Sequence, residues 1–121
     1  MNILLVEDNP TDAKLLSAVL QLSGHRVLEK GTAEQAMEEI KAARQPELIL
    51  LDLQLPGMGG LELARRLKAD PETRHIPIVA ITAELESFSR KEALDAGCNA
   101  YIIKPVDTRM LSDQIASVAA H

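Results

Sequence analysis

Five polar residues with the potential for chemistry stand directly after short apolar runs, at four places along the sequence: Glu7, Asp8, Asp52, Thr82 and Lys104. If the apolar runs form a parallel sheet, their carboxyl ends meet at one edge, which is where such sheets bind ligands. Carboxylates gathered there would repel one another by about 4 kcal/mol per pair at a separation of ~4 Å. The predicted site therefore needs compensating positive charge, of which Lys104 supplies one unit.

The remaining negative charge calls for a hard divalent cation, and Mg²⁺ is the cytoplasmic ion that binds carboxylates together with water and phosphate oxygens. No histidine follows an apolar run, and Cys98, the single cysteine, lies outside these positions, so zinc and copper are not expected. Three carboxylates, Mg²⁺ and Lys104 sum to about zero charge, which allows a phosphoryl group to approach. A carboxylate can itself attack phosphorus and give an aspartyl phosphate.

Asp52 is the expected nucleophile, because it follows the most apolar run and therefore the most central strand. Phosphoryl transfer depends on positioning and charge neutralisation more than on covalent assistance. Mg²⁺ and the Lys104 ammonium would neutralise the phosphoryl oxygens, and the Thr82 hydroxyl would donate a hydrogen bond to them. The Gly-rich segment 53–60 would leave room for a phospho-donor.

The elements that position these groups are five predicted strands, at residues 3–6, 26–28, 48–51, 78–81 and 101–103. The first, third and fourth runs are apolar almost throughout, which is typical of central parallel strands covered on both faces. The second run alternates with polar residues and is expected at an edge of the sheet.

Helical patterns separate the strands and are expected to begin near Pro10, Thr32, Leu61, Leu85 and Asp107. The first ends at Gly24 and carries one apolar stripe, formed by Leu15, Leu16, Val19 and Leu20. Thr32 and Gln35 form a capping box for the second, and Asp107 is the expected N-cap of the fifth. Five alternations of strand and helix predict an α/β fold with a doubly wound parallel sheet and helices on both faces.

Length and composition limit the classes of protein. The 121 residues predict one domain, 1–121, and 46% hydrophobic and 26% charged residues are typical of globular proteins. A net charge of −5 and 2% aromatic residues argue against direct nucleic-acid binding. No apolar run approaches the ~20 residues of a membrane helix, and the first residues lack signal-peptide features, so the cytoplasm is expected. A further domain, in a longer protein, would be expected after His121.

Four segments, in this order and at these spacings, resemble the receiver domain of two-component response regulators: LVEDN (5–9), LLDLQLPGMGG (50–60), ITA (81–83) and YIIKP (101–105). The resemblance covers essentially the whole chain and implies a flavodoxin-like, five-stranded sheet in the order 2-1-3-4-5. It implies that Asp52 accepts the phosphoryl group and that Mg²⁺ is held by Glu7 through water, by Asp8 and Asp52, and by the backbone carbonyl of Gln54.

The resemblance also implies roles and partners beyond the acidic site. The phosphoryl donor would be a histidine kinase or a histidine phosphotransfer protein, and the domain would assist its own phosphorylation without being an enzyme. Gln54 and Glu84 would tune dephosphorylation, while Thr82 and Tyr101 would form the switch. A downstream protein, or a second copy, would bind helix four, strand five and helix five. A cis peptide is expected between Lys104 and Pro105.

Three alternatives share the fold or the nucleophile. A flavin-binding module would follow its first strand with a hydroxyl-rich loop, whereas Glu7 and Asp8 would repel a phosphate. A dehalogenase-type phosphatase would carry a second Asp two residues after Asp52, where this chain has Gln54. A pseudo-receiver, which binds proteins without being phosphorylated, would be expected to lack Asp52, Thr82 or Lys104. All three are present, so this alternative remains but is not favoured.

Overall fold

The computed structural model of the chain describes residues 1–42, 45–83 and 90–119, in which strands and helices alternate from end to end. The strands are β1 (Asn2–Val6), β2 (Arg26–Lys30), β3 (Leu48–Asp52), β4 (Ile78–Ala83) and β5 (Ala100–Lys104). The helices are α1 (Pro10–Leu22), α2 (Ala33–Ala42), α3 (Gly60–Ala69), α4 (Arg90–Asp95) and α5 (Leu111–Ala119).

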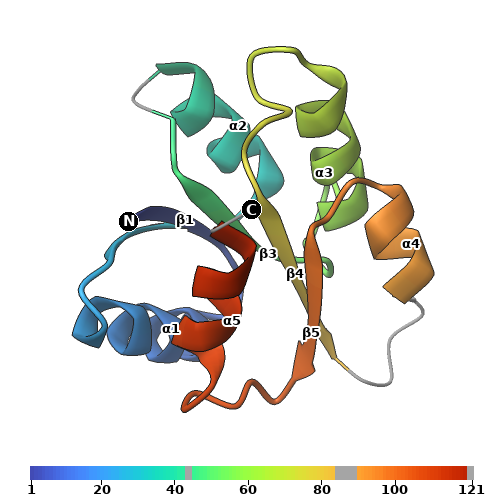
Figure 1. Cartoon of the computed structure of the whole chain (residues 1–121). Coiled ribbons are helices and arrows are strands. Elements are labelled where there is room, and N and C mark those ends of the chain that lie inside the picture. Colours follow the sequence, from blue (N-terminus) through green and yellow to red (C-terminus); the bar gives the residue numbers. More distant parts are fainter. Residues whose placement is uncertain (43–44, 84–89, 120–121) are drawn as a thin grey trace.

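The strands form one parallel sheet in the order β2-β1-β3-β4-β5 (Figure 1). The predicted α/β class and the implied strand order are therefore confirmed. The chain builds outward from β1 in one direction to β2 and then in the other to β3, β4 and β5. The carboxyl ends of β1 and β3 flank the point where this direction changes, which is where open parallel sheets form their binding crevice.

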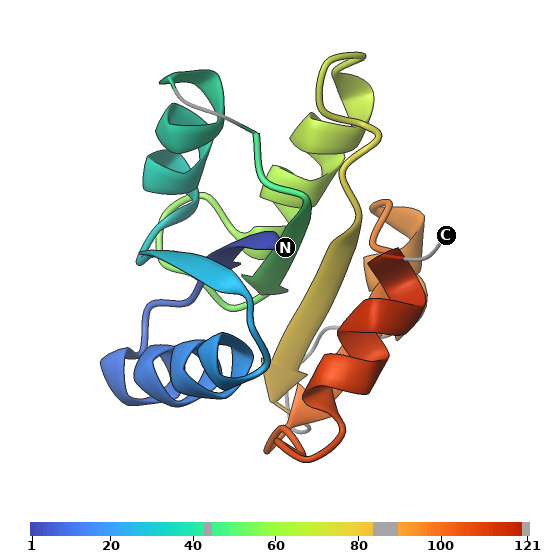
Figure 2. The same ribbon diagram turned by 60° about the vertical axis from the view of Figure 1, so that its left-hand side comes forward.

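Helices cover both faces of the sheet: α1 and α5 lie on one side, and α2, α3 and α4 on the other (Figures 1 and 2). Side chains of a strand point alternately to the two faces. Ile3 and Leu5 accordingly pack with α1 and α5, whereas Leu4 and Val6 pack with α2 and α3. Both faces of the central strands are thus apolar, which explains the nearly unbroken apolar runs.

The burial of the strands matches their predicted places. Every residue of β3 is buried, so Asp52 ends the most enclosed strand of the sheet. The strand β2 is largely exposed and lies at the edge, as its alternating pattern predicted. The Lys104–Pro105 peptide is cis, which confirms the implied bond. Among the described residues, none of the helices combines the length and the apolar character needed to cross a membrane.

Two predictions about the helices are wrong. Leu15 does not join the buried stripe of α1, since 53% of it is exposed and it lies beside Lys104 and Pro105 at the rim of the helix. Asp107 is not the N-cap of α5, which begins at Leu111. The Asp107 carboxylate instead accepts a hydrogen bond from the Arg109 backbone, and its carbonyl accepts one from Met110, so it closes a separate turn before the helix.

The remaining differences concern boundaries. The strands β4 and β5 extend beyond the predicted runs, so Thr82 and Lys104 are strand residues rather than the residues that follow a strand. Within the described residues α4 covers Arg90–Asp95, and the expected start of this helix at residue 85 lies outside them. Because Lys104 belongs to β5, regular strand geometry directs its side chain toward the carboxylates of the site.

Candidate functional site

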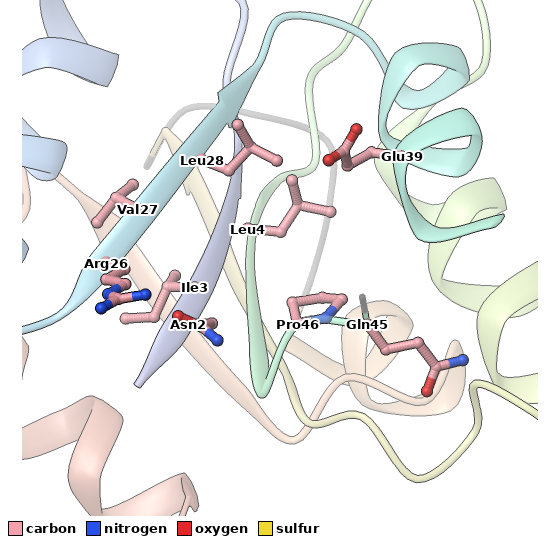
Figure 3. A pocket seen from close by; sticks show the side chains of 9 residues that line it. All are labelled: Asn2, Ile3, Leu4, Arg26, Val27, Leu28, Glu39, Gln45 and Pro46. Carbon is pink, nitrogen blue, oxygen red and sulfur yellow. The ribbon is translucent and has the colours of Figure 1, made fainter. Parts of the chain in front are cut away.

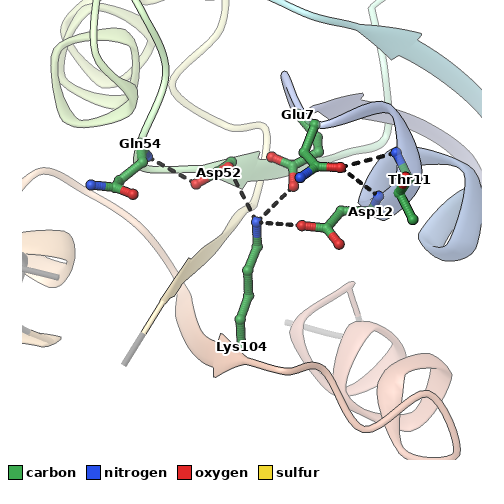
Figure 4. Close-up of polar contacts among 7 residues, drawn as sticks. Glu7, Thr11, Asp12, Asp52, Gln54 and Lys104 are labelled. Carbon is green, nitrogen blue, oxygen red and sulfur yellow. Dashed lines mark hydrogen bonds and ion pairs between the residues drawn. The ribbon is translucent and has the colours of Figure 1, made fainter. Parts of the chain in front are cut away.

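The carboxyl edge of the sheet brings most of the predicted site residues together. Glu7 follows β1 directly, Asp52 ends β3, and Lys104 ends β5. Figure 4 shows the Lys104 side chain reaching across from β5 to a group of carboxylates. Thr82, in β4, lies between the strands that carry Asp52 and Lys104 and is fully buried. The expectation that these groups meet at one edge is therefore confirmed by their placement.

The Lys104 ammonium has three carboxylate partners (Figure 4). Its Nζ donates to Glu7 Oε1 at 2.6 Å, to Asp12 Oδ2 at 3.1 Å and to Asp52 Oδ2 at 3.3 Å. Burial alone would lower the pKa of Lys104, but the hydrogen bond to Glu7 and the charge of Asp52 raise it above its ordinary value. The side chain is therefore a permanent cation, with all three of its N–H groups engaged.

Glu7, Asp8 and Asp52 each place a carboxylate oxygen within 4.8 Å of the others. Glu7 and Asp52 are buried, whereas Asp8 is exposed. Burial, followed by the neighbouring Asp52 carboxylate, raises the pKa of Glu7 to about 8, although Lys104 acts in the opposite direction. Burial and the crowding of acidic groups thus oppose a negative charge on Glu7 unless further positive charge is bound at the site.

Two buried oxygen atoms at this edge have no hydrogen-bond partner among the described residues: Glu7 Oε2 and Thr82 Oγ1. A buried polar group without a partner costs about 1–3 kcal/mol. Glu7 Oε2 can coordinate a metal ion or accept a hydrogen bond from water bound to one. The Thr82 hydroxyl can donate a hydrogen bond to an oxygen of a ligand. The acidic trio and the free acceptor on Glu7 fit a hard, oxygen-liganded cation such as Mg²⁺.

The local backbone fixes the orientation of Asp52. The backbone N–H of Gln54 donates to Asp52 Oδ1 at 2.9 Å, while Oδ2 faces Lys104. The start of α3 presses against the same strand end, since a Cβ at Gly60 would lie 2.5 Å from the Asp52 carbonyl oxygen. The glycine is required there by close approach of two backbones. One carboxylate oxygen is therefore tethered and the other points into the charged cluster.

A hollow in the surface lies at this edge of the sheet. It has a volume of about 410 Å³ and is lined by Asp8, Gln54 and Pro56 and their neighbours in the loop that follows β3. The predicted room for a phospho-donor beside segment 53–60 corresponds to this hollow. A separate cavity of about 240 Å³ lies toward the amino ends of β1 and β2, where Figure 3 shows Leu4, Val27 and Leu28 among its lining residues. It contains none of the predicted site residues.

Tyr101, a residue of the predicted switch, lies in β5 three residues before Lys104. Tyr101 is half-buried in β5 and packs against the core on the face covered by α2, α3 and α4. It pairs with Ala80 of β4, whereas Thr82 pairs with Ile103. Tyr101 and Thr82 therefore lie on the same face of neighbouring strands, offset by one diagonal step. Glu84 lies outside the described residues.

Asp12, the second-closest partner of Lys104, is absent from the predicted site. It belongs to the first turn of α1, where an acidic residue is ordinarily explained by the helix dipole. The available signal was its position: the helix starts at the sheet edge that carries Glu7 and Asp8, so its first turn must face the same cluster. Attention to strand ends alone leaves this helical residue out.

Comparison with known proteins agrees with this geometry. Residues 3–116 match the family model described as "Response regulator receiver domain". PhoB, the phosphate regulon transcriptional regulatory protein of Pseudomonas aeruginosa, is 40% identical over 116 residues, which are 96% of this chain and 50% of PhoB. The chain thus spans half the length of that relative.

Solved structures share the fold over nearly the whole chain. A putative response regulator from Chloroflexus aurantiacus superposes with a TM-score of 0.94 at 29% identity, covering 99% of this chain and 98% of that one. The receiver domain of a sensor histidine kinase from Pseudomonas aeruginosa has a TM-score of 0.88 and 32% identity, with coverages of 99% and 98%. That structure has a magnesium ion coordinated in its active-site cleft.

Proposed function

The chain belongs to the family of response regulator receiver domains, and on that premise we propose that it accepts a phosphoryl group on Asp52 from a histidine kinase or histidine phosphotransfer protein. The observation that carries the proposal is the pair formed by Asp52 and Lys104, with the unpartnered Thr82 hydroxyl buried on the strand between them. These are the three groups whose loss would mark a pseudo-receiver.

In the proposed reaction Asp52 Oδ2 attacks phosphorus, a new O–P bond forms, and the bond from phosphorus to the donor nitrogen breaks. The Gln54 N–H holds Oδ1, which keeps the carboxylate from rotating. Lys104 is within hydrogen-bond distance of Oδ2, so its ammonium can follow the charge onto the phosphoryl oxygens. The Thr82 hydroxyl gains the acceptor that it lacks among the described residues.

Mg²⁺ would be held by Asp8 and Asp52, by Glu7 through water, and by the backbone carbonyl of Gln54. When bound it supplies positive charge that neutralises phosphoryl oxygens. The fit rests on the acidic trio and on the free Glu7 Oε2. The magnesium ion in the related receiver domain supports the same choice of ion.

The output of the site is proposed to be a switch from Thr82 to Tyr101. Phosphorylation replaces the charge of a carboxylate by about −2 and adds strong acceptors, which would draw the Thr82 hydroxyl toward Asp52. Because Tyr101 is the diagonal neighbour on the same face, its ring is placed to fill the space that Thr82 leaves. A downstream protein or a second copy would then bind the face of α4, β5 and α5.

The remaining roles follow from the same reaction. Gln54 is proposed to tune the lifetime of the phosphoryl group through its side chain, and Glu84 is proposed to do so from outside the described residues. Residues 1–121 would act as one receiver domain in the cytoplasm, serving as a signalling acceptor rather than an enzyme. It would not contact nucleic acid or a membrane directly.

Intact-mass spectrometry after incubation with a small phospho-donor tests the proposal. We expect one phosphoryl group on the wild-type protein in Mg²⁺, far less after chelation, and none on Asp52→Asn. A protein that folds but takes no phosphoryl group in Mg²⁺ would instead be a pseudo-receiver. Undiminished incorporation in Asp52→Asn would assign the acceptor to another residue.

The switch needs a separate measurement, because phosphorylation could occur without it. Chemical shifts of backbone amides, compared with and without beryllofluoride in Mg²⁺, should change around Tyr101 and α4 as well as around Asp52. Changes confined to the surroundings of Asp52 would contradict the switch and leave the acceptor role intact.

A further inference from the structure

Asp12 differs from the other two partners of Lys104 in one respect. Glu7 and Asp52 belong to the acidic trio that fits a divalent cation, whereas Asp12 does not. Its Oδ2 lies 3.1 Å from Lys104 Nζ, closer than the oxygen of Asp52 at 3.3 Å. Asp12 is therefore the partner that Lys104 would not share with the metal.

The start of α1 holds Asp12 in this place. The Asn9 side chain caps the helix and accepts hydrogen bonds from the backbone N–H groups of Thr11 and Asp12. Pro10 occupies the first turn, where its fixed backbone angle favours helix initiation. The Asp12 carboxylate is also stabilised by the positive end of the helix dipole. Its position results from local structure and does not depend on Lys104 alone.

A divalent cation and the Lys104 ammonium carry charge of the same sign and draw on the same two buried carboxylates. When Glu7 and Asp52 turn toward a cation, Lys104 loses part of their attraction and is repelled by the cation itself. The side chain is long and partly exposed, so it could then move toward solvent. An anionic partner outside the metal-binding group would oppose that movement.

We propose that Asp12 is a positioning residue, which keeps the Lys104 ammonium beside Asp52 while Glu7 and Asp52 are engaged by the divalent cation. This rests on the proposed phosphoryl-acceptor function, and assigns Asp12 a role in the same reaction. Asp12 does not touch the phosphoryl group. It acts through Lys104. A well-placed ammonium speeds phosphorylation more than the added negative charge of Asp12 slows it.

A simple charge effect would have the opposite sign. If Asp12 only added negative charge, its removal would make the site less repulsive to an incoming phosphoryl group and would speed phosphorylation. If Asp12 positions Lys104, its removal slows phosphorylation at saturating Mg²⁺. The direction of the change therefore separates the two roles.

The test compares initial rates of phosphorylation by acetyl phosphate, measured by intact mass at saturating Mg²⁺ for each variant. We expect Asp12→Ala to reduce the rate about fivefold or more, the size usual for a coupled pair of contacting charged residues. Glu62→Ala is the matched control, because it removes a carboxylate of similar exposure from a cation other than Lys104: Glu62 lies 2.9 Å from Arg66. It should leave the rate unchanged.

A double-mutant cycle identifies the route of the effect. In a Lys104→Met background, Asp12→Ala should cause no further loss, since the group on which it acts is gone. An unchanged or faster rate in Asp12→Ala overturns the proposal, as does an equal loss in the Lys104→Met background or in the Glu62→Ala control. A wild-type protein that takes no phosphoryl group would instead overturn the acceptor function.

Discussion

The amino and carboxyl edges of the same sheet differ in how their polar groups are satisfied. At the amino edge, the backbone N–H of Asn2 donates to Glu47 Oε1 at 3.0 Å, and the N–H of Ile78 donates to Asn99 Oδ1 at 2.9 Å. The Asn99 N–H in turn donates to the Ile78 carbonyl at 2.7 Å. These contacts give backbone groups at the ends of the strands hydrogen-bond partners from neighbouring segments.

The carboxyl edge contains the opposite arrangement. Glu7, Asp12 and Asp52 share the Lys104 ammonium, Asp8 lies beside Glu7 and Asp52, and two buried oxygens have no partner among the described residues. Crowding of like charges and unpartnered polar atoms both reduce stability. The molecule therefore gains stability at one edge of the sheet and keeps binding capacity at the other, and a bound ligand can offset the loss of stability there.

The largest effect is expected from removing Lys104, the cation shared by Glu7, Asp12 and Asp52. Lys104→Met should lower the free energy of unfolding by about 2 kcal/mol in Mg²⁺-free buffer, because three carboxylates lose their shared partner; partial exposure keeps the loss below that of a fully buried pair. Added Mg²⁺ should recover much of it by binding the folded state. Denaturant unfolding with and without Mg²⁺ measures both quantities.

Lys91→Met provides the control for that experiment. Lys91 is also paired with an aspartate, Asp95, at 3.5 Å, but both side chains are largely exposed. Surface pairs of this kind contribute little to stability. A loss in Lys91→Met equal to that in Lys104→Met would show that the carboxyl edge has no special electrostatic character.

A smaller loss is expected at the amino edge. Asn99→Ala removes the acceptor of the Ile78 N–H, and should lower the free energy of unfolding by about 1 kcal/mol. Phosphoryl incorporation should stay at the wild-type level, because the change lies at the far end of β4 from Thr82. A parallel loss of phosphorylation at temperatures where the variant is fully folded would contradict the separation of the two edges.

The smallest effect concerns the thiol beside Asn99. Cys98 is buried, and burial raises its pKa to about 11, although Lys68 acts weakly in the opposite direction. At pH 8 the thiolate is scarce, so iodoacetamide should label native protein slowly and denatured protein at the normal rate of a cysteine. Rapid labelling of the native protein would show that the amino edge is more open than its hydrogen bonds indicate.

Much of the fold could be predicted from the sequence, because the patterns that indicate strands and helices are local. Unbroken apolar runs identify central strands, and the alternating pattern of β2 identifies an edge. The start of α5 was misplaced because Asp107 has the chemistry of an N-cap, and only the structure distinguishes a capped turn from a capped helix. Leu15 was misplaced because apolar spacing shows which residues share a helix face, whereas burial depends on what packs against that face; 53% of Leu15 is exposed.

Site residues could be predicted from the sequence where they stood next to the end of a predicted strand. Glu7, Asp52 and Lys104 were predicted to meet, and they do. Asp12 was not predicted, because it lies in the first turn of α1 and not at a strand end. Its contact with Lys104 depends on the direction in which α1 leaves β1, which spacing and periodicity alone do not give.

If Asp52 lowers the stability of the carboxyl edge and is also the phosphoryl acceptor, then Asp52→Asn should change both stability and phosphorylation. Asparagine keeps the acceptor for the Gln54 N–H and removes one of the crowded charges. We expect no phosphoryl incorporation in Mg²⁺ and a free energy of unfolding in Mg²⁺-free buffer raised by about 1 kcal/mol. Wild-type incorporation, or a loss of stability comparable to that of Lys104→Met, would contradict it.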